Sequence, residues 1–192
     1  MLHYQEMTTV LNIIAETLWY FLPALVANIA PVFAAAYNWL PSLATPLDRG
    51  LSWQGAPLIG NHKTVRGLVV ALFFGSVTGF TQYLLTQAGW EPQRIFVSYS
   101  SPVFVVLWGT LLGGCSIIGD ALKSFFKRRL GILPGTTWVP WDQVDMVIGV
   151  LLVTQWFAPL PPSHITAAFI VIGVGMLVTS ALGIVIGIKK SL

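Results

Sequence analysis

Long apolar stretches separated by short polar segments dominate the pattern of this chain. A helix needs roughly 17–25 apolar residues to cross the core of a bilayer. Five stretches approach or exceed that length: Leu11–Leu40, Leu68–Gln87, Pro102–Gly119, Met146–Leu160 and Ile165–Ile188. The pattern therefore predicts an all-α integral membrane protein with five transmembrane helices.

Two of the predicted spans have unusual lengths. The first is over-long and contains Pro23 and Pro31, so we expect it to be kinked, tilted, or to enter through an interfacial segment. The fourth is short unless its helix begins near Asp142, which would put Asp142 and Asp145 at the membrane boundary. The sequence shows no internal repeat, and we expect residues 1–192 to form a single membrane domain.

The composition supports the same class of protein. Hydrophobic residues make up 55% of the chain, charged residues make up 9%, and the mean hydropathy is +0.76. These values lie outside the range of soluble globular proteins. The single cysteine, Cys115, excludes an internal disulfide and a cysteine-based metal site.

The positive charges fall mainly on one side of the five predicted spans. Between spans and at the C-terminus, that side carries Arg49, Lys63, Arg66, Lys123, Lys127, Arg128, Arg129, Lys189 and Lys190. The other side carries one basic residue, Arg94. The positive-inside rule then predicts an external N-terminus, a cytoplasmic C-terminus and a multi-pass protein of the cell membrane. We expect cytoplasmic loops at about 41–67 and 120–145 to form the active site.

The densest group of charges lies in G-D-A-L-K-S-F-F-K-R-R-L-G, which begins at Gly119. On a helix the spacing i, i+3, i+4, i+7 places four polar residues on one face, with Arg128 at its edge: Asp120, Lys123, Ser124 and Lys127. Such a face suits a metal-bound polyphosphate at a membrane surface. The alternative is a positive-inside anchor, which would need neither the carboxylate nor the hydroxyl. Arg129 falls on the other side of the helix, where we expect a cation at the lipid headgroups.

A second group, W-D-Q-V-D, places Asp142 and Asp145 one helical turn apart. Magnesium typically takes one or two carboxylates together with substrate phosphates. The alternative is an N-terminal helix cap, which explains one of the two carboxylates. Trp138 and Trp141 lie beside this motif; they fit an interfacial aromatic belt, with stacking on a cytosine ring as the alternative.

A third group is G-N-H-K-T-V-R-G, from Gly60 to Gly67. The glycines free the backbone to approach a ligand, and Lys63, Thr64 and Arg66 supply donors for phosphate. The spacing from glycine to Lys-Thr differs from that of a Walker A motif. The alternative is a basic loop without a ligand.

Taken in order, K-T-V-R-G, G-D-A-L-K-S-F-F-K-R-R-L-G and D-Q-V-D resemble the CDP-archaeol synthase family. These are small, five-span membrane CTP:lipid-phosphate cytidylyltransferases related to the CDP-diacylglycerol synthases. The resemblance covers roughly Pro46 to Gly149. The His-Gly-Gly element of the diacylglycerol enzymes is absent, because Val139-Pro140-Trp141 stands there. The P-L-D-x-G stretch at Pro46–Gly50 is also similar to the family and makes Asp48 a further candidate.

The resemblance implies Mg²⁺-dependent transfer of CMP from CTP to a lipid phosphate, with release of pyrophosphate. The metal-binding carboxylates of the family map onto Asp120 and Asp142, with Asp145 as the third. Asp120, Asp142 and Lys127 form the predicted catalytic set. The predicted substrate-binding residues are Lys63, Thr64, Arg66, Lys123, Ser124 and Arg128.

Two other functions fit parts of the pattern. A CTP-dependent polyprenol or lipid kinase would use similar nucleotide and metal sites. A small transporter would place its ionisable residues near the bilayer midplane, whereas here they lie at one surface. The expected partners are CTP, a lipid phosphate and the bilayer, and no nucleic acid. The sequence leaves open the lipid tail, the oligomeric state and the roles of Asp48, His62 and Glu16.

Overall fold

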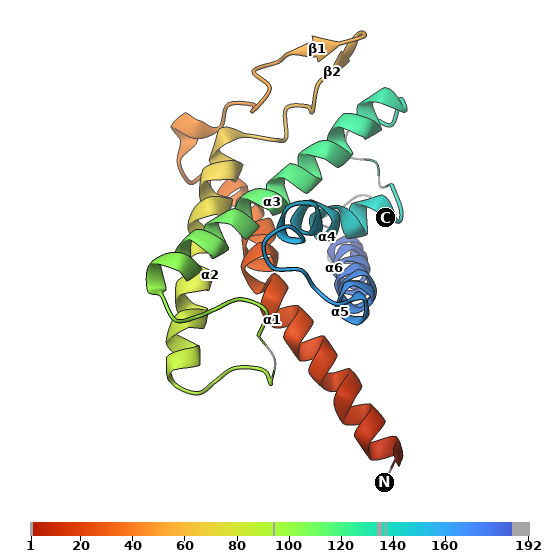
Figure 1. Cartoon of the computed structure of the whole chain (residues 1–192). Coiled ribbons are helices and arrows are strands. Elements are labelled where there is room, and N and C mark those ends of the chain that lie inside the picture. Colours follow the sequence, from red (N-terminus) through yellow and green to blue (C-terminus); the bar gives the residue numbers. More distant parts are fainter. Residues whose placement is uncertain (1, 94, 134–135, 137, 186–192) are drawn as a thin grey trace.

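Long helices joined by short segments make up most of the molecule (Figure 1). The computed structural model describes residues 2–93, 95–133, 136 and 138–185. Its helices are α1 (Leu2–Ala36), η1 (Pro41–Leu43), α2 (Val65–Gln87), α3 (Pro102–Arg129), α4 (Trp141–Thr154) and a continuous helical run of α5 (Pro162–Ala167), η2 (Ala168–Ile172) and α6 (Gly173–Val185). Arg94, Lys189, Lys190 and the predicted cytoplasmic C-terminus lie outside the described residues.

The starts of α2 and α3 follow from local sequence. Thr64 precedes α2, and its hydroxyl oxygen accepts a hydrogen bond from the N–H of Gly67 at 3.1 Å. Ser101 accepts from the N–H of Phe104 in the same way, and Pro102 occupies the first position of α3. Both arrangements satisfy N–H groups that have no partner within a helix.

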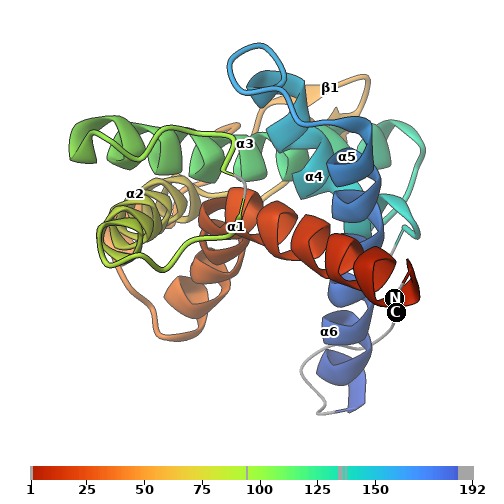
Figure 2. The same cartoon turned by 60° about the horizontal axis from the view of Figure 1, so that its bottom comes forward.

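The first helix bends in its middle part, as Figure 2 shows. Pro23 and Pro31 both lie within it. Proline lacks the N–H that the helical ladder needs, and its ring pushes against the preceding turn. Of the three arrangements expected for the over-long first span, the structure therefore adopts the kinked one.

Four helical stretches in the described part of the chain are long and apolar enough to cross a bilayer. They are Met7–Ala36, Val65–Gln87, Pro102–Arg129 and Pro162–Thr179. The fourth predicted span corresponds to α4, whose 14 residues extend about 21 Å against a bilayer core of about 30 Å. The chain is thus mostly helical with several membrane-crossing helices, and the fifth crossing stays a prediction.

Two element predictions need correction. Residues 120–129 continue α3 as one helix, so the predicted loop at 120–145 shrinks to residues 130–140. The segment before α2 also contains a small hairpin, β1 (Ser52–Trp53) paired antiparallel with β2 (Ala56–Pro57), in a fold predicted to be all-α. Gln54 and Gly55 connect the strands with φ values of 54° and 77°, as a two-residue turn with a left-handed backbone requires.

The backbones of α3 and α4 are in direct contact. A Cβ atom on Gly119 would lie 2.2 Å from the carbonyl oxygen of Asp145, and one on Gly149 would lie 2.4 Å from that of Cys115. Helices in membranes gain packing in this way because small residues let their backbones touch. The contact places Asp120, the residue after Gly119, beside the first turns of α4.

A buried apolar cluster lies between α1, α3, α4 and the last helical run. Its fully buried members include Phe21, Leu112, Met146, Val147 and Val150. On the outer faces of the helices many large apolar side chains are instead exposed, among them Val32, Phe73, Val103 and Leu107. Exposed apolar residues on helices of this length suit contact with lipid.

We expect Gly119→Ala to destabilise the protein by about 2 kcal/mol or more, because overpacking at a backbone contact cannot be relieved by moving a side chain. The midpoint of thermal unfolding in detergent micelles measures this. Gly175→Ala is the matched control, since a Cβ there meets nothing within 4 Å. Equal unfolding midpoints for the two variants would contradict the close contact.

Candidate active site

The ammonium group of Lys123 lies among three carboxylates. Its Nζ atom is 3.0 Å from an oxygen of Asp120, 3.0 Å from one of Asp142 and 2.6 Å from one of Asp145. The four side chains are only 5–19% exposed. Three carboxylates that are this close together and this little exposed to water are stable only if nearby cations neutralise their charge.

Two further lysines complete the charge balance. Lys63 forms an ion pair and a hydrogen bond with Asp120. The Nζ atom of Lys127 lies 3.2 Å from both carboxylate oxygens of Asp142 and donates to the carbonyl oxygen of Thr136 at 2.6 Å. Three ammonium groups therefore face three carboxylates. We call these six residues the ionic cluster: Lys63, Asp120, Lys123, Lys127, Asp142 and Asp145.

Three separate elements deliver these side chains. The last turns of α3 carry one carboxylate and two lysines on one face, and the first turn of α4 carries the other two carboxylates. Lys63 comes from the segment that leads into α2. The three sequence motifs, far apart along the chain, thus meet at one place.

Four predicted substrate-binding residues lie outside the ionic cluster. Thr64 caps α2, and Arg66 donates to Asn38 Oδ1 and the Trp39 carbonyl, both at 3.3 Å. Ser124 is 6% exposed within α3. Arg128 donates to the carbonyl oxygen of Ile132 at 2.5 Å, and its Nε atom is buried without a partner.

Asp142 lies in the first turn of α4, whose N-terminus has no side-chain cap, so Asp142 is not the helix cap that its motif offered as the alternative. One of its oxygens accepts from the N–H of Trp138 at 2.6 Å, and both accept from Lys127. The Trp138 N–H and the ammonium groups of Lys123 and Lys127 all favour the charged form of the Asp142 carboxyl. The group is therefore an anion at neutral pH.

The donor set of the ionic cluster fits a hard divalent cation. Oxygens of Asp120, Asp142 and Asp145 all reach one point, which Lys123 Nζ occupies. Carboxylate oxygens are the protein ligands that magnesium prefers. Within the described residues no group of three acidic, histidine or cysteine side chains is spaced to hold a metal directly. A cation would therefore have to displace the Lys123 ammonium.

An apolar hollow of about 440 Å³ opens beside the ionic cluster, between α3 and α4. Apart from Lys123, Asp145 and Arg129, its walls are almost entirely apolar. They comprise Gly119, Leu122, Phe126, Leu130, Trp138, Trp141, Ile148 and Leu152. A ligand with a charged head and an apolar tail could therefore contact both regions at once.

Arg129 does not behave as the sequence predicted. Instead of extending toward lipid headgroups, its guanidinium donates to the carbonyl oxygens of Pro57 at 2.9 Å and Leu58 at 3.1 Å. It also lies 4.2 Å from the ring centre of Phe125 and 5.1 Å from that of Trp53. The helical wheel placed Arg129 away from Asp120 but could not show the hairpin that covers that side.

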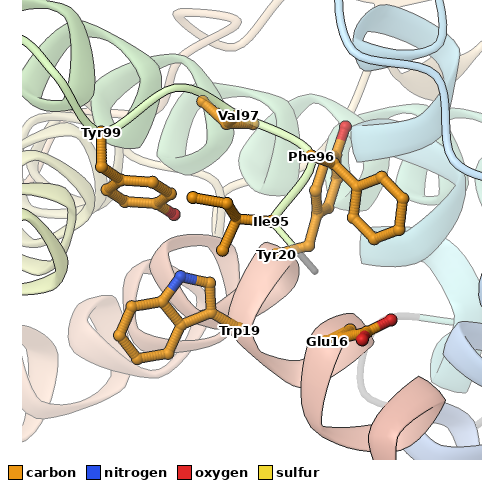
Figure 3. A pocket seen from close by; sticks show the side chains of 7 residues that line it. All are labelled: Glu16, Trp19, Tyr20, Ile95, Phe96, Val97 and Tyr99. Atoms are coloured by element: carbon orange, nitrogen blue, oxygen red, sulfur yellow. The ribbon is translucent and has the colours of Figure 1, made fainter. Parts of the chain in front are cut away.

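A second polar group lies away from the ionic cluster, where α1 and α5 meet. His164 Nε2 and Glu16 Oε2 are 2.8 Å apart, and the ring of Phe96 stands edge-on to that of His164 at 4.7 Å. Figure 3 shows Glu16 with Trp19, Tyr20 and the segment that includes Phe96 around a narrow pocket. The pocket has no room for a water molecule, and the hydrogen bond between His164 and Glu16 joins the two helices.

Comparisons with known proteins give a consistent result. The family described as CarS-like, CDP-archaeol synthase, matches residues 10–191. The CDP-archaeol synthase of Methanosarcina barkeri is 33% identical over 181 residues, covering 88% of this chain and 98% of that protein. The one from Methanocaldococcus jannaschii is 36% identical over 155 residues, covering 78% and 80%. A solved structure described as an intramembrane enzyme for archaeal membrane lipids biosynthesis aligns with a TM-score of 0.67 and 26% identity, covering 89% of this chain and 94% of that one.

We expect Lys123→Met to destabilise the protein by about 3 kcal/mol, because three carboxylates lose the cation between them. Adding Mg²⁺ should raise the thermal unfolding midpoint of this variant more than that of the wild type, since the metal then binds without displacing an ammonium group. Arg49→Met, which removes an exposed cation of a neighbouring loop, is the control. An equal Mg²⁺ shift in wild type and Lys123→Met would argue against a cation site here.

Proposed function

Because this chain belongs to the CDP-archaeol synthase family, we propose that it transfers CMP from CTP to the phosphate of an archaeol-type membrane lipid. The products are a CDP-activated lipid and pyrophosphate. The observation that best supports this reaction is the position of the ionic cluster beside a large apolar hollow. A membrane lipid phosphate has the same two parts, a charged head and an apolar body.

The reaction is an in-line displacement at the α-phosphorus of CTP. An oxygen of the lipid phosphate forms the new P–O bond, and the bond from the α-phosphorus to the oxygen of pyrophosphate breaks. The second pKa of a phosphate monoester is near 6, so the nucleophile is mostly dianionic at neutral pH. No general base is required, and the protein contributes by positioning the substrates and neutralising their charge.

We propose that Lys63, Lys123 and Lys127 bind phosphate oxygens of the two substrates. In the structure each of these ammonium groups is paired with a carboxylate. The carboxylates Asp120, Asp142 and Asp145 are the residues that would hold Mg²⁺. A bound Mg²⁺ neutralises phosphate charge and polarises the α-phosphoryl group. The lysines, freed from the carboxylates, would then be available to the triphosphate and the lipid phosphate.

We infer that the apolar hollow receives the lipid chain next to its phosphate. Leu122 and Phe126 of α3, with Leu130 directly after it, lie on one wall, and Ile148 and Leu152 of α4 on the other. Contact with such a surface excludes water from the reacting phosphates, which strengthens their interactions with the lysines. The walls contribute no polar side chain apart from Lys123, Asp145 and Arg129.

We further propose that the chain crosses the cell membrane five times, with its N-terminus outside and the ionic cluster on the cytoplasmic side. Arg49 and Lys63 of the segment 37–64 support this, together with the clustered cations at the end of α3. In Figure 1 the N-terminal end of α1 lies far from the hairpin and the end of α3. The short α4 would make the fourth crossing.

The reaction predicts a specific set of products. Purified protein should release pyrophosphate from CTP only when a lipid phosphate and Mg²⁺ are both present. Asp120→Asn should lower this turnover about a thousandfold, which corresponds to about 4 kcal/mol, because a metal ligand that acts in the transition state is lost. Glu91→Gln, which makes the same acid-to-amide change at an exposed loop residue, should have no effect.

Phosphorus NMR and mass spectrometry of the lipid product distinguish the alternatives. Release of CDP, with a new phosphate on a lipid alcohol, would identify a kinase and refute the proposed transfer. Pyrophosphate formed equally without the lipid phosphate, or in excess EDTA, would refute the mechanism. Full turnover by Asp120→Asn would show that the polar face of α3 is not part of the active site.

Orientation can be tested with introduced cysteines. Ser52→Cys and Thr136→Cys should react with a membrane-impermeant maleimide only from the cytoplasmic side, and Ser163→Cys only from outside. All three positions are exposed, whereas the native Cys115 is 1% exposed and should not react. Labelling of the residue 52 and residue 136 positions from opposite sides of the membrane would contradict a single site.

A further inference from the structure

Asp48 is a buried carboxylate whose oxygens are both occupied by backbone groups. It is 5% exposed. One oxygen accepts from the N–H of Gly50 at 3.1 Å, and the other accepts from the N–H groups of Ile59 and Gly60, both at 3.0 Å. Burial would raise the pKa of Asp48, but these three donors hold the pKa below its ordinary value. The group is thus an anion that joins the two ends of the segment containing the hairpin.

The same segment holds the backbone of Lys63 from two sides. The N–H of Lys63 donates to the carbonyl oxygen of Gly60 at 3.2 Å, and its carbonyl accepts from the N–H of Leu47 at 2.7 Å. Gly60 has a φ of +94°, which only glycine adopts without strain. Gly60, which Asp48 binds, and Leu47, which directly precedes Asp48, are therefore the residues that hold the backbone of Lys63.

The hairpin is docked on α3 by Arg129. Two hydrogen bonds of its guanidinium end on the carbonyls of Pro57 and Leu58, directly before the residues held by Asp48, and a third at 3.5 Å ends on the carbonyl of Trp53. Trp53 of the hairpin stacks on Phe125 of α3 with ring centres 5.8 Å apart, and the guanidinium contacts both rings. A cation on aromatic faces with two directed hydrogen bonds fixes both distance and orientation.

We propose that Asp48 and Arg129 are positioning residues for the reaction, which dock residues 46–64 on α3 so that the ammonium group of Lys63 reaches Asp120. Neither residue needs to contact a substrate. Asp48 fixes the shape of the segment, Arg129 fixes its place on the helix that carries Asp120, and Lys63 is the group that they position. This inference rests on the proposed function, because it assigns Lys63 to phosphate binding.

The contacts argue against a direct role of Asp48 as a metal ligand. Both of its oxygens are directed at backbone N–H groups, and the lysines of the ionic cluster pair with the carboxylates of that cluster instead. A ligand role would require those hydrogen bonds to break. Loss of the Asp48 charge should therefore act only through the geometry of Lys63.

A double-mutant cycle tests the proposal. Asp48→Asn and Arg129→Gln should each lower turnover at saturating CTP by on the order of 10–100-fold, since small displacements of a positioning group have effects of that size. In a Lys63→Met background, each should lower the remaining turnover by less than about threefold, because the group that they position is already absent. Arg49→Gln, an exposed neighbour in the same segment, should match wild type.

Hydrogen exchange measured by mass spectrometry gives a readout that does not depend on turnover. Peptides covering residues 46–64 should exchange faster in Asp48→Asn and Arg129→Gln than in wild type, while α3 and α4 peptides remain unchanged. Unchanged exchange at 46–64 would overturn the proposal. If this exchange rises as expected but wild type forms no CDP-lipid, docking of the segment is supported and the proposed function is refuted.

Independent effects of the substitutions on turnover would also overturn the proposal. If Asp48→Asn or Arg129→Gln lowers turnover by the same factor with and without Lys63, the residue acts by general stability or by its own contact with a substrate. Turnover within twofold of wild type in either single variant overturns the proposal for that residue. If Asp48→Asn fails to fold, Arg129→Gln carries the same test through an independent contact.

Discussion

The balance of three carboxylates against three ammonium groups is the interaction on which this structure depends. Helix α3 can approach α4 because Gly119 and Gly149 have no side chains at the contact. That approach brings Asp120 next to Asp142 and Asp145, at the end of an apolar helix pair where their mutual repulsion would be poorly screened. Lys123 lies among them and joins the two helices electrostatically.

The same balance explains how one group of residues can serve both folding and chemistry. Each lysine of the ionic cluster already faces a carboxylate, so the site is neutral and stable without substrate. In the proposed reaction, a divalent cation and a polyphosphate would supply the opposite charges and take over both sets of partners. The apolar hollow lies directly beside the ionic cluster. The body of a membrane lipid in this hollow would place its phosphate next to the cluster.

Segments from distant parts of the sequence complete the site. The hairpin before α2 is held on the last turn of α3 by Arg129, and Asp48 joins the residues on either side of the hairpin. These contacts bring the backbone of the segment to a defined position, from which Lys63 extends to Asp120. A loop that would otherwise be a basic segment at the membrane surface thereby becomes one wall of the active site.

The sequence by itself determined the membrane class, most of the helices and the motif residues that meet in the site. These depend on local periodicity and composition, which act over one or two helical turns. It placed the charged residues after Gly119 on a helical face, but it ended the preceding span at Gly119 and did not show that both belong to one continuous helix, α3. Only the tertiary structure decided that Lys123 lies among three carboxylates and that Arg129 binds carbonyls 71 and 72 positions away. Those partners are fixed by helix packing and chain reversal, which no local pattern encodes.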